Sequence, residues 1–94
     1  MLFEEILKAV KNGKKAARKG WNGKGMFIYF VEPSTVPFEK LRGNAAKHIN
    51  KTVTNQENAC IYGHIDMKTS DGKILVGWCP SQFEMFADDW TIVE

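Results

Sequence analysis

Cationic and aromatic residues are concentrated in one short segment, Arg18–Phe30 (RKGWNGKGMFIYF). Three glycines surround Trp21 there and let the backbone approach an anion closely. Arg18, Lys19 and Lys24 supply positive charge for a phosphate group. The glycine spacing fits neither the GxGxxG dinucleotide fingerprint nor a P-loop, and no long helix follows. The segment therefore predicts a generic phosphate-contacting loop with one stacking side chain.

Three tryptophans, Trp21, Trp78 and Trp90, stand at the ends of strand-like runs, beside small or polar residues. If they gather at one rim of a sheet, their ring faces can stack on a nucleobase, which is worth roughly 1–3 kcal/mol per base. Filling the core of a small domain explains each tryptophan equally well. The pattern leaves both roles open, a stacking wall and a core filler.

Charge is distributed unevenly along the 94 residues, although the net charge is only +2. Seven lysines and arginines lie between residues 8 and 24, with no acid among them. The last eleven residues carry Glu84, Asp88, Asp89 and Glu94 and no base. The basic segment favours a partner that bears phosphate, whereas the acidic tail disfavours a long polyanion. A nucleotide-sized ligand fits this balance better than a nucleic acid.

The sequence offers no constellation of residues for catalysis. His48 lies in a polar connection, and His64 is a lone histidine on an alternating run, which is more often a surface residue than a general base. Ser81 is better explained as a helix cap than as a nucleophile. Asp88 and Asp89 are adjacent, so in an extended chain they point to opposite faces. We therefore expect a protein that is not an enzyme.

Cysteine usage and the first residues bear on compartment and cofactors. Cys60 and Cys79 are expected as reduced, partly buried thiols, and with His64 they lack the paired spacing of a zinc site. Glu4 and Glu5 interrupt the first apolar residues, where a secretory signal would be continuous. No apolar run is long enough to span a bilayer. We expect a cytoplasmic protein with no metal, no cofactor and no membrane partner.

The opening segment MLFEEILKAVKNG predicts a helix of about three turns. Its apolar residues recur at three- and four-residue spacing and form one stripe, made of Leu2, Phe3, Ile6, Leu7 and Val10. Acids occupy the first turn and lysines the last, which suits the helix dipole, and Gly13 ends the helix.

The remaining elements indicate an α+β fold. The strand predictions are Lys14–Gly20 at a sheet edge, Met26–Val31 buried, Cys60–Trp78 as a hairpin turning at Asp71-Gly72, and a last strand within Asp88–Val93. Ser81 and Glu84 form a capping-box pattern for a short helix. The middle, residues 32–59, reads as a long connection with a helical turn near Phe38–Leu41. The predicted fold is an N-terminal helix packed on a small antiparallel β-sheet, with a short C-terminal helix.

Three motifs resemble a known family of small phage proteins, the second Thoeris anti-defence family. They are the lead helix FEEILKAVKNGKK, the tryptophan loop RKGWNGKGMFIYF, and the C-terminal IDMKTSDGKILVGWCPSQFEMFADDW. The motifs occur in order and cover the helix, the loop and the C-terminal third. Residues 32–59 carry no signature of the family.

The resemblance implies a sponge. Such proteins bind and sequester glycocyclic ADP-ribose, the cyclic ADP-ribose isomer made by Thoeris, without cleaving it, so that the defence effector is not activated. They form homotetramers with ligand pockets between subunits. The implied protein is a single nucleotide-sequestering domain over residues 1–94, acting in the cytoplasm of the infected bacterial host, with cyclic dinucleotides as a further ligand class.

The resemblance also assigns residues to the pocket. Trp21, with Phe27 on the next strand, resembles the stacking wall for the base, and Trp78, Ser81 and Gln82 resemble a turn that contacts ribose and phosphate. Asp88, Asp89 and Trp90 would complete the pocket, from the same subunit or from a neighbouring one. Arg18 and Lys24 are assigned to phosphate on charge alone.

Two other functions remain as alternatives. A single-stranded nucleic-acid binding module would use the same aromatic and basic residues, although the acidic tail argues against it. A phosphodiesterase or lyase would destroy the nucleotide signal instead of holding it. Release of an intact ligand on heating would distinguish a sponge from such an enzyme.

Overall fold

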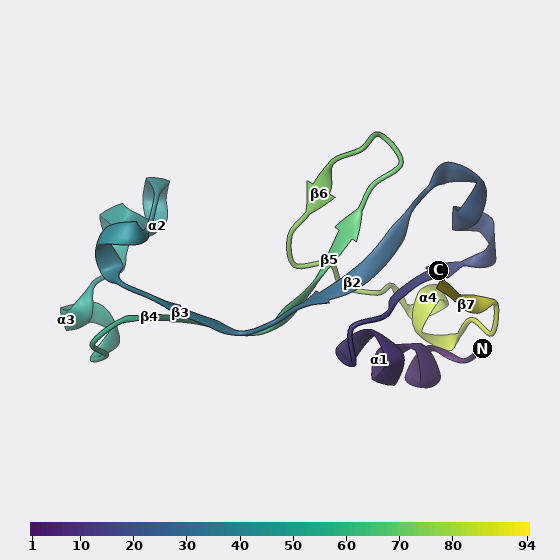
Figure 1. The fold of residues 1–94 in the computed structure, drawn as a ribbon, viewed down its shortest axis with the longest axis horizontal. Coiled ribbons are helices and arrows are strands. Elements are labelled where there is room, and N and C mark those ends of the chain that lie inside the picture. The colour runs from purple at the N-terminus through teal and green to yellow at the C-terminus, as the bar shows by residue number, and fades with distance from the viewer. The chain divides into compact units, whose positions relative to one another are not determined.

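The computed structural model describes residues 1–94, with the side chain of Asn22 left aside, and the chain divides into two compact units (Figure 1). We call residues 1–31 and 64–94 the sheet unit, and residues 32–63 the insert. The sheet unit contains α1 (Phe3–Lys11), β1 (Lys15–Arg18), the 3-10 helix η1 (Lys19–Lys24), β2 (Phe27–Val31), β5 (His64–Lys68), β6 (Ile74–Leu75), α4 (Gln82–Phe86) and β7 (Trp90–Val93). The insert contains β3 (Ser34–Val36), the 3-10 helix η2 (Phe38–Lys40), α2 (Gly43–His48), α3 (Lys51–Thr54) and β4 (Ala59–Ile61).

The sheet unit confirms the predicted α+β class. Its five strands are ordered β6-β5-β2-β1-β7, and neighbouring strands run antiparallel. The edge position predicted for Lys14–Gly20 is wrong, because β1 lies between β2 and β7. The last strand of the chain pairs with all four residues of β1, from Lys15 opposite Val93 to Arg18 opposite Trp90.

Helix α1 is confirmed and covers one face of the sheet. Ile6 and Val10 are fully buried, whereas Leu2 and Leu7 at the margin of the predicted stripe are 46% and 43% exposed. Gly13 follows the helix with φ +98°, a left-handed conformation that glycine adopts without strain. The fully buried part of the stripe is therefore narrow, with Ile6 in one turn and Val10 in the next.

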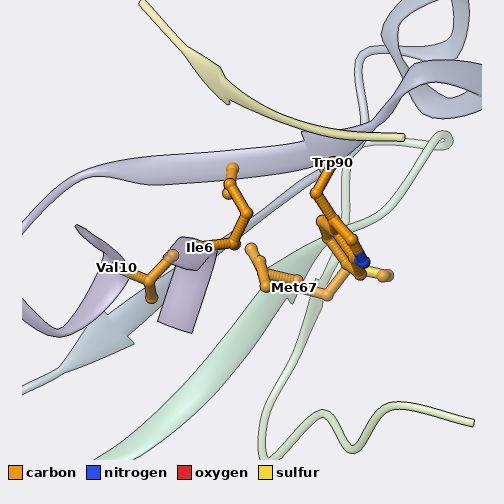
Figure 2. Packing of buried hydrophobic residues seen from close by; sticks show 6 residues of the cluster. Ile6, Val10, Met67 and Trp90 are labelled. Atoms are coloured by element: carbon orange, nitrogen blue, oxygen red, sulfur yellow. The ribbon is translucent and has the colours of Figure 1, made fainter. Parts of the chain in front are cut away.

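The core lies between α1 and the sheet (Figure 2). Its buried members are Ile6, Val10, Ala16, Ile28, Met67 and Trp90. Trp90 is fully buried and is the largest of the fully buried side chains. Side chains alternate across a strand, so Ile28 faces the core while Phe27 and Tyr29 lie on the opposite face of β2.

The hairpin between β5 and β6 is confirmed at its turn. Gly72 has φ +82°, and the Thr69 N–H donates to the Lys73 carbonyl at 2.8 Å. The second strand ends at Leu75, earlier than the pattern through Trp78 predicted. Gly77, with φ +78°, redirects the chain there, and the Trp78 N–H then donates to the Ile65 carbonyl at 2.7 Å.

The insert is more ordered than a long connection. Strands β3 and β4 pair antiparallel, from Ser34 opposite Ile61 to Val36 opposite Ala59. The helical turn near Phe38–Leu41 is confirmed as η2, whereas the pair of three-residue strands was too short for an alternating pattern to reveal. Among the residues described in the insert, Ala59 has the one buried side chain.

The structure also bears on the predictions for the two cysteines and for a membrane-spanning segment. Cys60 and Cys79 are both exposed, so the prediction of partly buried thiols is wrong. Cys60 lies in β4 of the insert and Cys79 in the segment before α4, and neither belongs to the buried core. Among the described residues, no helix has the length and apolar character needed to cross a bilayer.

Candidate functional site: the cleft beside helix α4

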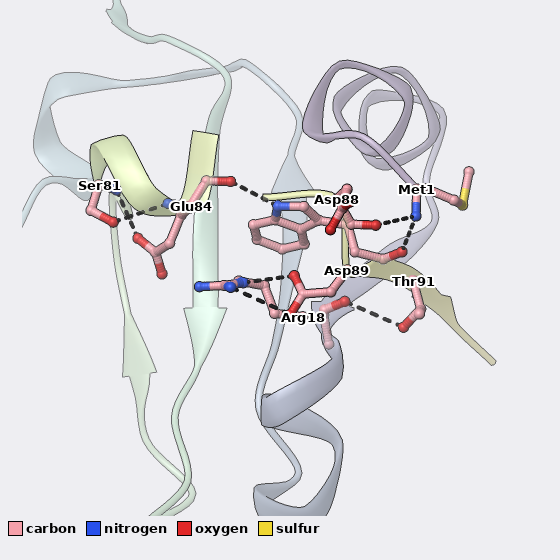
Figure 3. A network of polar contacts seen from close by, with 9 residues as sticks. Met1, Arg18, Ser81, Glu84, Asp88, Asp89 and Thr91 are labelled. Atoms are coloured by element: carbon pink, nitrogen blue, oxygen red, sulfur yellow. Dashed lines mark hydrogen bonds and ion pairs between the residues drawn. The ribbon is translucent and has the colours of Figure 1, made fainter. Parts of the chain in front are cut away.

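The short helix α4 is fixed at its first turn by the predicted capping box (Figure 3). The Ser81 hydroxyl accepts from the Glu84 N–H at 3.2 Å, and the Glu84 carboxylate accepts from the Ser81 N–H at 2.7 Å. These bonds satisfy backbone donors that a helix start leaves unpaired. Ser81 is thereby the residue that sets where α4 begins.

An ion pair joins Arg18, at the end of β1, to Asp89, before β7. The Arg18 Nε donates to Asp89 Oδ1 at 2.9 Å, and a terminal guanidinium nitrogen donates to Oδ2 at 3.3 Å (Figure 3). Both side chains remain about one-third exposed. The hydrogen bonds from Arg18 hold the pKa of the Asp89 carboxyl below its usual value, and those to Asp89 raise the pKa of Arg18. Asp89 is therefore ionised at neutral pH.

A cleft of about 480 Å³ lies beside α4, and we call it the α4 cleft. It is lined by Arg18, Gln82, Phe83, Phe86, Ala87, Asp88 and Asp89. Four of these residues were assigned to the pocket from the sequence: Arg18, Gln82, Asp88 and Asp89. The structure brings them together although 64 positions of chain separate Arg18 from Gln82.

The rings of Phe83 and Phe86 are the features of this cleft that sequence reasoning missed. They are 87% and 79% exposed, although a helix usually buries such residues. The capping box located the helix, but the pattern PSQFEMF does not say which face it buries. One signal in the sequence could have indicated this exposure. The two phenylalanines are three residues apart and so lie on one side of a helix that is too short to cover them.

The three tryptophans gather, but against one another. Trp21 packs on Trp90 at a centroid distance of 5.1 Å and on Trp78 at 6.0 Å, and Trp78 lies 6.3 Å from Trp90. All three pairs are close to perpendicular. Trp90 is fully buried and its Nε1 donates to the Glu84 carbonyl at 2.8 Å, so it offers no ring face to a ligand within this chain. Trp21 and Trp78 are half-buried at the edge of the core.

The other assigned residues lie elsewhere. Phe27 is on the sheet face opposite the core and does not share a wall with Trp21; its ring lies near Tyr29 and under the Lys15 ammonium. Lys24 ends η1 with an exposed side chain. The expected stacking wall of Trp21 and Phe27 is therefore divided between the two faces of the sheet.

Fold and cleft together define a small α+β protein whose antiparallel sheet packs one helix against its core and carries an open, charged, aromatic-lined cleft at α4. Comparison with known families matches residues 1–93 to the Thoeris anti-defense 2-like domain. A curated relative, Thoeris anti-defense 2 of Bacillus phage SP01, is 37% identical over 94 residues, which are 99% of this chain and 94% of the relative. The chain belongs to the Thoeris anti-defense 2-like family, and this membership supports an anti-defence function.

Proposed function

We propose that this protein is a sponge for the nucleotide signal of Thoeris. It binds a cyclic ADP-ribose-type molecule, glycocyclic ADP-ribose, in the cytoplasm of the infected host and withholds it from the defence effector. The observation that carries the proposal is the α4 cleft, where a guanidinium, two carboxylates, an amide and two exposed phenyl rings converge.

The chemistry of the cleft suits such a ligand. Exposed phenyl rings can stack on a planar base, worth roughly 1–3 kcal/mol. The carboxylate of Asp88 and the amide of Gln82 can accept from ribose hydroxyls, while guanidinium N–H groups of Arg18 can donate to phosphate oxygens. A volume of about 480 Å³ lies within the range of roughly 300–1,000 Å³ that ligand sites occupy.

The cleft also supports retention over cleavage. The Asp89 carboxyl is ion-paired with Arg18 and has a lowered pKa, which makes it a poor proton donor. Glu84 is used in the capping box of α4. Both carboxylates are therefore engaged in contacts that the fold uses.

Assembly of subunits would complete the site. Tight ligand sites bury most of their ligand, and an open cleft on one chain buries less. A groove of about 400 Å³ lies next to the cleft and is lined by Leu2, Phe3, Glu4, Leu7, Met85 and Phe86. Phe86 lines both, so a second copy seated on this apolar groove would also wall the cleft. We therefore propose a homo-oligomer as the working form, and the family resemblance stated above makes a tetramer the proposed assembly.

The test is ligand capture followed by release. Purified protein is incubated with glycocyclic ADP-ribose, freed of unbound ligand by gel filtration, heated, and the released molecule is identified by mass spectrometry. A sponge releases the intact ligand in stoichiometric amount. Release of a hydrolysed product identifies an enzyme, and absence of any captured nucleotide contradicts the proposal.

Variants test whether the ligand binds in the α4 cleft. Phe83→Ala with Phe86→Ala should reduce retention at least about tenfold if a base stacks there. Tyr62→Ala is the matched control, because Tyr62 is also an aromatic residue with 92% exposure but lines a different cleft. Equal retention by both variants would remove the α4 cleft as the site.

A further inference from the structure

A second cleft opens on the sheet face opposite α1. Its volume is about 570 Å³, and we call this surface the lysine face. It is lined by Gly13, Lys14, Lys15, Phe27, Tyr29, Lys68, Ile74 and Val93. The lining residues come from β1, β2, β5, β6 and β7 and from the turn after α1, so the cleft extends across the sheet.

Two aromatic rings in its lining lie next to each other. Phe27 and Tyr29 are two residues apart on β2 and therefore project from the same face. Their ring centroids are 6.1 Å apart, and the rings are tilted by 55°. Both are half-exposed, and Ile74 beside them is 62% exposed. Rings held on a strand are rigid, so little conformational freedom is lost when flat groups stack on them.

Three lysines line the cleft, and its described lining contains no acid. Asp66, opposite Tyr29 on β5, is buried and accepts a hydrogen bond from the Gly77 N–H. The Lys15 ammonium lies 4.7 Å from the centroid of the Phe27 ring. Lys68 is held at the rim by its hydrogen bond to the Gly25 carbonyl, at 2.9 Å. Lys14 is exposed at the end of the turn that precedes β1. Three ammonium groups thus border one pair of rings.

We propose that the lysine face binds single-stranded nucleic acid. Bases that are not paired can stack on Phe27 and Tyr29, while the lysines contact the phosphates that follow each base. A duplex hides its base faces in the stack and would leave both rings unused. Aromatic side chains that stack on bases, next to a positively charged groove, are a recurring arrangement for binding single strands, and some of these proteins place the aromatic residues on a sheet face.

Three of the four acids in the acidic tail lie away from the lysine face in the folded protein, and the fourth, Glu94, follows Val93 of its lining. In the sequence, four carboxylates within the last eleven residues argue against a nucleic-acid partner. In the structure Asp88 and Asp89 line the α4 cleft, and Glu84 caps α4. None of these three lines the lysine face. The proposal is independent of nucleotide sequestration, because the two surfaces share no residue.

The test is fluorescence anisotropy with a labelled oligothymidylate and a labelled oligouridylate, titrated with the intact protein at several salt concentrations. Affinity should fall with rising salt, and Phe27→Leu with Tyr29→Leu should weaken binding about tenfold or more. Leucine keeps most of the buried volume, and circular dichroism verifies the fold. Unchanged affinity in this variant, or no salt-dependent binding by the wild type, overturns the proposal.

A charge variant tests the same face independently. Lys14→Gln with Lys15→Gln should reduce the steepness of log affinity against log salt by roughly 0.7 for each phosphate that is no longer neutralised. Lys8→Gln with Lys11→Gln removes equal charge from α1 and should leave the slope unchanged. Equal slopes in both double variants contradict a role for the lysine face.

A competition experiment identifies the ligand of the lysine face, and a cross-test of the variants distinguishes this binding from nucleotide sequestration. Thymidine monophosphate should compete poorly, and competition as strong as that of the oligonucleotide would overturn the single strand as occupant. The ring variant Phe27→Leu with Tyr29→Leu should still retain glycocyclic ADP-ribose, whereas Phe83→Ala should still bind oligothymidylate. Loss of both activities in either variant would contradict separate surfaces.

Discussion

Arg18 and Asp89 are joined by two hydrogen bonds, of 2.9 and 3.3 Å, which tie the last residue of β1 to the residue before β7. The Lys19 N–H also donates to the Asp89 carbonyl at 3.0 Å. The charge of Arg18 is therefore shared with a carboxylate, and the guanidinium is oriented before any ligand arrives. Preorganisation of this kind reduces the entropic cost of binding.

The Arg18–Asp89 pair predicts a stability that depends on pH. Because the pKa of Asp89 is lowered in the folded protein, the stabilisation is present above the ordinary aspartate pKa of about 3.9 and is lost as pH falls through the lowered value. Asp89→Asn should unfold at lower denaturant than wild type at pH 7, and the difference should shrink below about pH 4.

The measurement is the unfolding of wild type and Asp89→Asn by guanidinium chloride or urea, at roughly unit steps between about pH 2.5 and pH 8. Asp88→Asn is the matched control, since it removes the adjacent exposed carboxylate. A gap between wild type and Asp89→Asn that stays constant with pH would contradict the pairing.

Substitution of Trp90 should cause the largest loss of stability of any single replacement in the chain. It is fully buried among Phe3, Trp21 and Trp78, so Trp90→Ala should cost about 3–5 kcal/mol through the loss of burial and the cavity left behind. Such a loss is a large part of the stability of a small domain, roughly 5–15 kcal/mol.

Chemical denaturation monitored by circular dichroism measures this loss. Phe83→Ala is the control, because an 87% exposed ring should change stability by no more than about 0.5 kcal/mol. If Trp90→Ala unfolds at the same denaturant concentration as Phe83→Ala, Trp90 is not the centre of the core.

Local signals predicted most of the sheet unit. Spacing of apolar residues located α1, the Asp71-Gly72 turn located the hairpin, and the Ser81–Glu84 pattern located α4, because each depends on interactions within a few residues. The position of β1 inside the sheet depends on its pairing with β7 at the far end of the chain. The lysines near β1 gave no indication of that pairing.

The candidate site was predictable only in part. Charge drew attention to Arg18, and the family resemblance drew attention to Gln82 and Asp89; these three residues do meet. Trp90 and Trp21 looked alike in sequence, beside small or polar neighbours, yet one is fully buried and the other half-buried. Burial of a tryptophan is decided by which strands pair, and a Trp21 variant would therefore mix a packing effect with any binding effect.

Ser81 allows its capping role to be separated from contact with a ligand. Ser81→Ala removes the acceptor for the Glu84 N–H and should cost about 1 kcal/mol, loosening the helix that carries Phe83 and Phe86. Ser81→Asn keeps a good cap. Denaturation gives the stability, and gel-filtration capture of glycocyclic ADP-ribose gives retention. If capping is the role of Ser81, Asn restores both quantities; stability restored without retention would assign Ser81 to direct ligand contact instead.

Asp66 is a buried carboxylate that positions Trp78. Its Oδ1 accepts from the Gly77 N–H at 3.0 Å and lies 3.4 Å from His64 Nε2, and Asp66 is 6% exposed. Asp66→Ala removes this acceptor from the N–H of the exposed residue Gly77 and should cost about 1 kcal/mol, the net contribution of a typical hydrogen bond. Because Gly77 directs the chain into Trp78, the near-ultraviolet circular dichroism of the tryptophan cluster should also change.

Asp66→Asn is the matched comparison, since its amide oxygen can still accept from the Gly77 N–H. We expect the tryptophan signal of Asp66→Asn to stay close to that of wild type and its stability to fall less than in Asp66→Ala. The same tryptophan spectrum in Asp66→Ala and wild type would show that the hydrogen bond from Trp78 to Ile65 alone holds the turn. In that case Asp66 has no positioning role.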